Sequence, residues 1–163
     1  IINLIHNQVA ALDGMAQCQS LSVSYIKPHG ALYNDMMAKP EVWQAVLQAV
    51  ASYHKPLKLM ILATANAADY QQQAAAAGVS LLLEAFADRR YTDAGKLTPR
   101  SQPGAVLHGA EVLTQVRQLL EQGTVTTDSG KALPLTADTL CVHGDNPELL
   151  AVLRRLRARL DAL

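Results

Sequence analysis

Two apolar runs of strand length set the fold class, at residues 58–63 (KLMILA) and 79–86 (VSLLLEAF). Neither run shows the strict apolar–polar alternation of a half-exposed strand, so both faces of each predicted strand are expected to be buried. Such strands are typical of parallel sheets covered by helices. Two further strands are predicted at 22–27 and 139–143. A succession of strands and helices of this kind forms either a doubly wound sheet or a (β/α) barrel.

Apolar residues at helical spacing predict the segments that join these strands. The first helix starts at the beginning of the sequence, where the apolar positions are Ile2, Ile5, Val9, Leu12 and Ala16. Further helices are predicted at 31–37 and 41–52, from Asn66 to Gly78, from Leu113 to Gly123, and from Asn146 onwards. Residues 88–104 are expected to form a long polar loop, and 124–135 a small hairpin. The sequence therefore predicts a single α/β domain over residues 1–163, with one helix followed by four strand–helix units.

Size and composition exclude several classes of protein. The chain has 163 residues, of which 50% are hydrophobic and 17% charged, and this composition excludes a disordered chain. No apolar run approaches the roughly 20 residues that span a bilayer, so we expect a soluble, cytoplasmic protein. The 14 basic residues balance the 14 acidic ones, so neither a nucleic acid nor a membrane surface is expected as a partner. Cys18 and Cys141 lack the spacing of a metal site and are expected to be reduced thiols.

Polar residues cluster where three of the predicted strands end. The clusters are Lys27 with His29, Glu84 with Asp88 and Arg89, and His143 with Asp145. In a parallel α/β fold the carboxyl ends of the strands form the ligand-binding edge, so these clusters are expected to converge on one site. A phosphate-binding loop is not indicated, because Ala110 follows 104–109 where that motif needs a lysine.

Four segments at the strand ends resemble one known family. They are Lys27–Asn34 (KPHGALYN), Glu84–Tyr91 (EAFADRRY), 97–105 (LTPRSQPGA) and 141–145 (CVHGD). In this order they are similar to successive motifs of the LamB/YcsF lactam-utilisation family. The resemblance implies a (β/α) barrel of the glycoside hydrolase/deacetylase type. It also implies ATP-dependent opening of 5-oxo-L-proline to L-glutamate, with ATP, accompanied by Mg²⁺, hydrolysed to ADP and phosphate. This activity belongs to a 5-oxoprolinase, whose A subunit works with two others, B and C.

The sequence departs from the family at its beginning. Family members start with an acidic strand motif and histidine-bearing segments that would precede Ile1. Four βα units are also too few for a barrel, since eight need about 250 residues. The chain is therefore expected to be the C-terminal portion of a larger protein, and this portion alone is expected to be inactive. The first or the last strand should then border either a missing segment or another copy of the chain, as in a homo-oligomer.

The candidate residues divide by their chemistry. Opening a lactam needs a base for water and an acid for the ring nitrogen, and His29 and His143 are the candidates for acid/base or metal-positioning groups. Glu84 and Asp88 are expected to orient water or these histidines. The candidates for binding substrate or phosphate are Lys27, Arg89, Arg100 and Asp145.

Two other functions stay open. Two histidines and two carboxylates could also serve a metal-dependent amide or N-acyl hydrolase that needs no ATP, although no H-x-x-x-H or H-x-H spacing supports such a site. The third hypothesis is a non-catalytic scaffold that positions its partner proteins. The metal content does not follow from the sequence.

Overall fold

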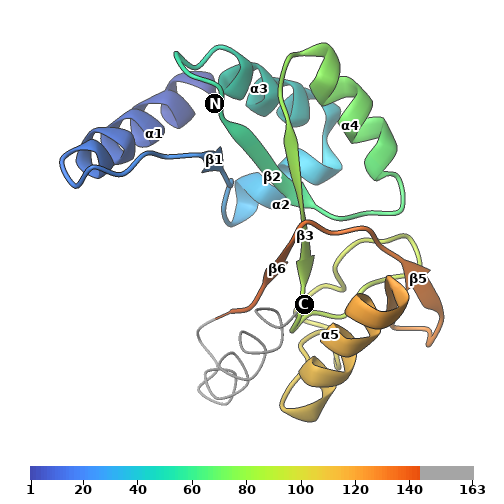
Figure 1. The fold of residues 1–163 in the computed structure, drawn as a ribbon. Coiled ribbons are helices and arrows are strands. Elements are labelled where there is room, and N and C mark those ends of the chain that lie inside the picture. The colour runs from blue at the N-terminus through green and yellow to red at the C-terminus, as the bar shows by residue number, and fades with distance from the viewer. Residues whose placement is uncertain (144–163) are drawn as a thin grey trace. The chain divides into compact units, whose positions relative to one another are not determined.

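The computed structural model has an α/β fold and describes residues 1–143 (Figure 1). In chain order its elements are α1 (Ile2–Gln17), β1 (Tyr25–Ile26), α2 (Ala31–Ala38), α3 (Pro40–Ala51), β2 (Lys58–Leu62), α4 (Ala67–Ala76), β3 (Leu81–Phe86), α5 (Ala110–Gln122), β4 (Thr124–Thr126), β5 (Ala132–Pro134) and β6 (Thr139–Cys141). The predicted helix from Asn146 onwards lies outside the described residues. None of the helices in the described part of the chain has the length and apolar character needed to cross a membrane.

The chain forms two compact units. The first unit comprises Ile1–Leu62 and Asn66–Leu83, and the second comprises Ala63–Ala65 and the chain from Glu84 onwards. Strand β3 therefore begins in the first unit and ends in the second. The expectation of a single domain over residues 1–163 stays a prediction.

Four strands form a parallel sheet in the order β1-β2-β3-β6. Strands β1 and β2 pair in parallel, as do β3 and β6. Two backbone hydrogen bonds join the segments of β2 and β3: the Leu59 N–H donates to the Ser80 carbonyl, and the Ala63 N–H donates to the Glu84 carbonyl. In both bonds the donor and the acceptor are the same number of residues apart in the sequence, as in a parallel pair of strands. The predicted α/β fold with a parallel sheet is confirmed. Closure into a barrel of the glycoside hydrolase/deacetylase type stays a prediction.

Strand β1 is shorter than the sequence predicts. The sequence predicts a strand over 22–27, but only Tyr25 and Ile26 pair with β2. Ser22 and Val23 contact side chains instead, because Lys55 donates to the Ser22 hydroxyl and the Val23 N–H donates to the Asp13 carboxylate.

Helix α3 provides most of the helical core of the first unit. The sequence predicts its apolar stripe, and the stripe residues Trp43, Val46, Leu47 and Val50 are buried. The helix packs against α1, α2 and β2. Burying a large apolar side chain contributes about 1.5–3 kcal/mol, so this stripe is a principal source of stability for the first unit.

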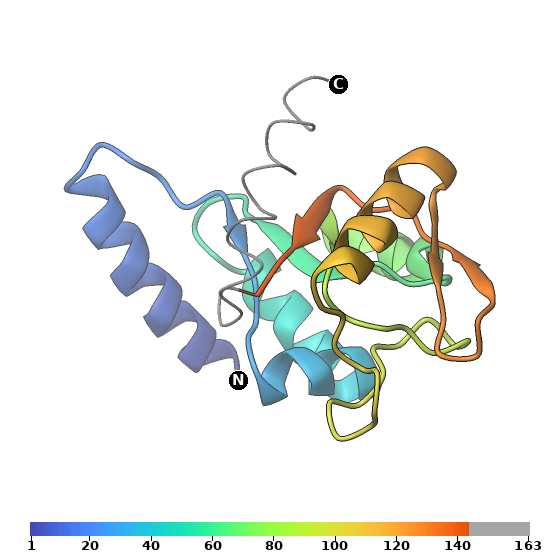
Figure 2. The same cartoon turned by 90° about the horizontal axis from the view of Figure 1, so that it is seen from below.

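The second unit is built around α5 and the hairpin that follows it. One buried apolar cluster of this unit consists of Ala87, Leu107, Val112 and Val116. Helix α5 ends at Gly123, whose left-handed φ of 64° favours glycine. Strands β4 and β5 then pair antiparallel, and β4 packs against α5 (Figure 2). The predicted hairpin at 124–135 is confirmed.

The predicted polar loop after β3 is held by contacts with itself and with the hairpin. Tyr91 forms isolated bridges with Leu97 and with Thr127. The Asp93 carboxylate accepts hydrogen bonds from Thr127 at 2.6 Å and from Lys131 at 2.7 Å. The hydrogen bond from Lys131 is the main reason why the pKa of Asp93 lies well below its ordinary value. The loop is therefore a fixed part of the second unit.

A buried carboxylate joins the end of α1 to the rest of the first unit. Asp13 is 1% exposed and accepts from the Lys55 ammonium at 2.6 Å, from the Val23 N–H at 3.2 Å and from Gln17 at 3.2 Å. The hydrogen bond from Lys55 lowers the pKa of Asp13, although burial acts in the opposite direction. Asp13 in its charged form therefore stabilises the folded state.

We expect Asp13→Asn to lower Tm by at least about 3 °C at pH 7, because an amide cannot pair with Lys55. A lowered folded pKa means that this stability is present above the unfolded pKa of about 3.9 and is lost as the pH falls through the folded pKa. The Tm difference between wild type and variant, measured by circular dichroism, should stay constant from pH 7 to about 5 and shrink below about pH 4.

Asp35→Asn is the matched control, since Asp35 pairs with Lys39 at 3.1 Å on the surface. Exposed pairs contribute little, so this variant should melt within about 2 °C of wild type. An Asp13→Asn protein that melts no lower than the Asp35→Asn protein contradicts the role of Asp13.

Candidate functional site

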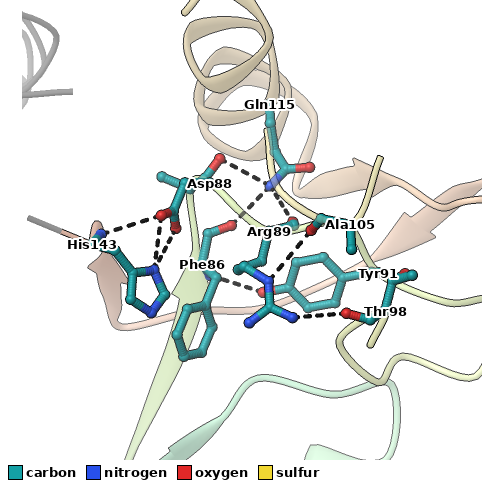
Figure 3. Close-up of polar contacts among 9 residues, drawn as sticks. Phe86, Asp88, Arg89, Tyr91, Thr98, Ala105, Gln115 and His143 are labelled. Atoms are coloured by element: carbon teal, nitrogen blue, oxygen red, sulfur yellow. Dashed lines mark hydrogen bonds and ion pairs between the residues drawn. The ribbon is translucent and has the colours of Figure 1, made fainter. Parts of the chain in front are cut away.

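A carboxylate and an imidazole meet where β3 and β6 end. Asp88 follows β3, His143 follows β6, and these strands are neighbours in the sheet. The Nδ1 atom of His143 lies 2.8 Å and 3.0 Å from the two Asp88 carboxylate oxygens (Figure 3). The backbone N–H of His143 also donates to Asp88, at 3.3 Å. The structure thus brings two of the predicted site residues, Asp88 and His143, into contact, and the roles predicted for them stay predictions.

This contact determines which imidazole nitrogen is available for chemistry. Asp88 is 2% exposed. An ionised carboxylate only accepts hydrogen bonds, so a neutral imidazole beside it would carry its proton on Nδ1 and keep the lone pair on Nε2. Nε2 points away from Asp88 (Figure 3). The Phe86 ring stacks on the imidazole, with 5.7 Å between ring centroids and 25° between planes. The pair can therefore accept a proton from water or another ligand at Nε2.

Gln115 of α5 fixes the turn that carries Asp88. Its Nε2 donates to the carbonyls of Phe86, Ala87 and Arg89 at 2.8, 3.1 and 2.9 Å. These carbonyls come at and just after the end of β3, so one side-chain amide ties the turn to α5. Gln115 is 4% exposed, and its Oε1 has no hydrogen-bond partner in the described part of the chain.

Tyr91 supports the same turn from its other side. Its hydroxyl accepts a hydrogen bond from the Phe86 N–H at 2.8 Å. Burial raises the pKa of Tyr91, and the charge of Glu84 adds to this effect, so the phenol is neutral at physiological pH. Glu84 itself is buried within β3.

Arg89 is a cation held in the interior of the second unit. It is 7% exposed, and its guanidinium donates to the carbonyl of Thr98 at 2.7 Å and to that of Ala105 at 3.4 Å (Figure 3). Burial, and then the positive charge of Arg100, lowers the pKa of Arg89, while Asp88 acts in the opposite direction. A guanidinium nevertheless stays charged at neutral pH.

The remaining predicted site residues belong to other segments of the chain. Lys27 and His29 follow the carboxyl end of β1 and line a hollow of about 680 Å³ within the first unit. Arg100 lies in the loop after β3 and is exposed. Asp145 lies outside the described residues. Convergence of all these residues on one site with Asp88 and His143 stays a prediction.

The donor groups of the second unit suit an oxyanion. Residues 1–143 contain no group of three or more histidine, cysteine, aspartate or glutamate side chains arranged to hold a metal ion. The start of α5 does not suit a phosphate, because the Glu111 carboxylate already accepts from the His108 N–H there, at 3.4 Å. The buried Arg89 guanidinium has the chemistry that binds a carboxylate or a phosphate.

Comparison with known proteins gives the family. The LamB/YcsF family profile matches residues 1–163. The chain belongs to the LamB/YcsF family. The resemblance found in the four strand-end motifs is thereby confirmed.

The relatives in this family are longer than the chain. The 5-oxoprolinase A subunit of Vibrio cholerae is 51% identical over 162 residues, which are 99% of this chain and 65% of that protein. The 5-oxoprolinase A subunit of Pseudomonas fluorescens strain Pf0-1 is 46% identical, over 98% of this chain and 64% of that protein. The crystal structure of a lactam utilization protein from Thermus thermophilus superposes with a TM-score of 0.85 at 30% identity, and the match covers 98% of this chain and 64% of that one.

Sequence reasoning missed the residues that support the site. Gln115 is a polar residue on the buried face of α5, close to Val112 and Val116, and such an interruption of an apolar stripe is the one signal that could have shown it. Phe86 and Tyr91 lie inside the EAFADRRY segment, but no local pattern shows that one ring packs on His143 and the other hydroxyl binds the backbone.

We expect Gln115→Leu to lower the free energy of unfolding by about 1–3 kcal/mol, because three carbonyls lose their shared donor while the side chain keeps a similar size. Urea denaturation of the protein measures this change. Gln122→Leu is the matched control on an exposed position at the end of the same helix, and its stability should lie within about 0.5 kcal/mol of wild type. Equal stability of the two variants would show that Gln115 does not hold the turn.

Proposed function

We propose that this chain is part of the A subunit of an ATP-dependent 5-oxoprolinase, which opens 5-oxo-L-proline to L-glutamate while ATP is hydrolysed to ADP and phosphate. The names of the relatives support this reaction, and they imply further subunits, for which B and C are our candidates. The observation that carries the proposal is the Asp88–His143 pair at adjoining strand ends, in the same unit as a buried arginine.

The reaction needs an activated carbonyl. A lactam is resonance-stabilised, and ATP, with Mg²⁺, supplies the activation by transferring its γ-phosphoryl group to the amide oxygen. Water then adds to the ring carbon, the carbon–nitrogen bond breaks, and the nitrogen takes up a proton. A second water releases phosphate from the resulting acyl phosphate and leaves the second carboxylate of glutamate.

In this proposal, residues of the chain itself remove and return the protons. Nε2 of His143 removes a proton from the attacking water and afterwards returns it to the ring nitrogen. Asp88 holds the imidazole in the tautomer that this needs and stabilises its protonated form, as in other carboxylate–histidine pairs. Glu84 and His29 are our candidates for further carboxylate and acid/base groups.

In this proposal, positively charged side chains bind the anionic groups of the reactants. Lys27, Arg89 and Arg100 are our candidates for stabilising the transferred phosphoryl group or the substrate carboxylate. Asp145, which belongs to the family motif CVHGD, is proposed as a further binding residue on the strength of that motif alone.

We expect Asp88→Asn and His143→Gln each to lower ATP-dependent glutamate release by at least about 100-fold in the complex of full-length subunits. Asn is chosen because Asp88 is buried and its volume must be kept. The double variant should be little slower than the slower single variant, because the two residues act as one unit. Far-ultraviolet circular dichroism checks that each variant is folded.

The control is His54→Gln, an exposed histidine of the first unit that should leave turnover unchanged. Folded Asp88→Asn and His143→Gln proteins with full turnover would favour the scaffold function. Ring opening without ATP that a chelator abolishes would favour the metal-dependent hydrolase.

A further inference from the structure

We propose that Arg89, assisted by Arg100, binds the carboxylate group of the lactam substrate. This inference rests on the proposed function and adds to it the group that anchors the substrate. It starts from one observation, which is that Arg89 is a buried cation whose hydrogen-bond partners in the described part of the chain are all backbone carbonyls.

A buried charge is costly unless an opposite charge compensates it. Arg89 has no carboxylate within ion-pair distance among residues 1–143, and the carbonyls of Thr98 and Ala105 are neutral. The adjacent carboxylate, Asp88, is committed to His143. Arg100 adds a second positive charge close enough to lower the pKa of Arg89. An anion that binds at Arg89 would offset this unfavourable electrostatic environment.

The donor groups that remain on Arg89 suit one carboxylate. Nε is used by Ala105, and one hydrogen of Nη2 is used by Thr98. In the described part of the chain no partner takes Nη1 or a second hydrogen of Nη2. Two guanidinium N–H groups of this kind can donate in parallel to a planar carboxylate. The several charges of a nucleotide triphosphate would need more donors than this pair provides.

The position of Arg89 also suits a substrate that reacts at His143. In the view of Figure 3, the guanidinium, the Phe86 ring and the His143 ring extend to the same side of the backbone, with Phe86 between the other two. A five-membered lactam holds its carboxylate and its amide on a rigid ring. In the proposed binding mode, a carboxylate anchored at Arg89 would leave the amide to face the imidazole, which lies against Phe86.

The test uses the complex of full-length subunits and measures KM for 5-oxo-L-proline and for ATP separately. We expect Arg89→Gln to raise KM for 5-oxo-L-proline by about 10–100-fold and to leave KM for ATP within about twofold, because a charged hydrogen-bonded pair contributes about 1.5–3 kcal/mol. Arg89→Lys should raise KM for 5-oxo-L-proline as well, since lysine keeps the charge but loses the paired donors. Arg100→Gln should have a smaller effect in the same direction.

Arg90→Gln is the matched control, because Arg90 is the next residue but pairs with Glu111, at 3.2 Å. Its two KM values should equal those of wild type. If Arg89→Gln does not fold, Arg89→Lys and Arg100→Gln take its place in the test. Each should then raise KM for 5-oxo-L-proline and leave KM for ATP within about twofold of wild type.

Three results would overturn the inference. A rise in KM for ATP alone would show that the guanidinium binds a phosphate. Unchanged KM values in folded Arg89 variants of an active complex would show that Arg89 is structural, and would leave the proposed function intact. A wild-type complex that does not open 5-oxo-L-proline would overturn the proposed function and, with it, the substrate assigned to this site.

Discussion

The hydrogen bonds from Gln115 to three carbonyls of one turn are the constraint on which the site depends. Backbone carbonyls at the end of a buried parallel strand cannot reach water and must find donors within the protein. One amide nitrogen on α5 meets this requirement for Phe86, Ala87 and Arg89. It thereby joins the helix to the strand end. Because the backbone there is fixed, the side chains of Asp88 and Arg89 leave it in defined and different directions (Figure 3).

The order of the strands in the sheet is the second feature that brings Asp88 and His143 together. Asp88 and His143 are 55 residues apart in the sequence, and they meet because β6 pairs with β3 rather than with the strands that precede it in the chain. Helix α5 connects the two, and the β4–β5 hairpin forms a separate two-stranded sheet, so neither strand of the hairpin comes between them. In parallel sheets, neighbouring carboxyl ends lie at one edge, and this property brings a carboxylate and an imidazole together here.

The sequence is informative where a pattern is local. Runs that are apolar on both faces predict β2 and β3, a helical stripe predicts α3, and polar residues after strands predict Asp88 and His143 as site residues. Contacts between distant residues leave no such pattern. Asp13 pairs with Lys55, 42 residues away, and this pair withdraws Ser22 and Val23 from the predicted first strand. Gln115 resembles an ordinary interruption of an apolar helix face, because the carbonyls that it satisfies belong to a different element.

Asp88 and Arg89 show why adjacent opposite charges can be kept apart. Both side chains are buried, and an ion pair between them would be the simplest way to offset the cost of burial. Among the described residues they form no such pair, since Asp88 binds His143 and Arg89 binds backbone carbonyls. A direct pair would remove the carboxylate that orients the imidazole and would neutralise the cation. Separate partners keep the Asp88 carboxylate on the imidazole and the positive charge of Arg89 in the same unit. The proposed anion-binding role of Arg89 requires this separation, because an ion pair with Asp88 would cancel the charge that attracts the anion.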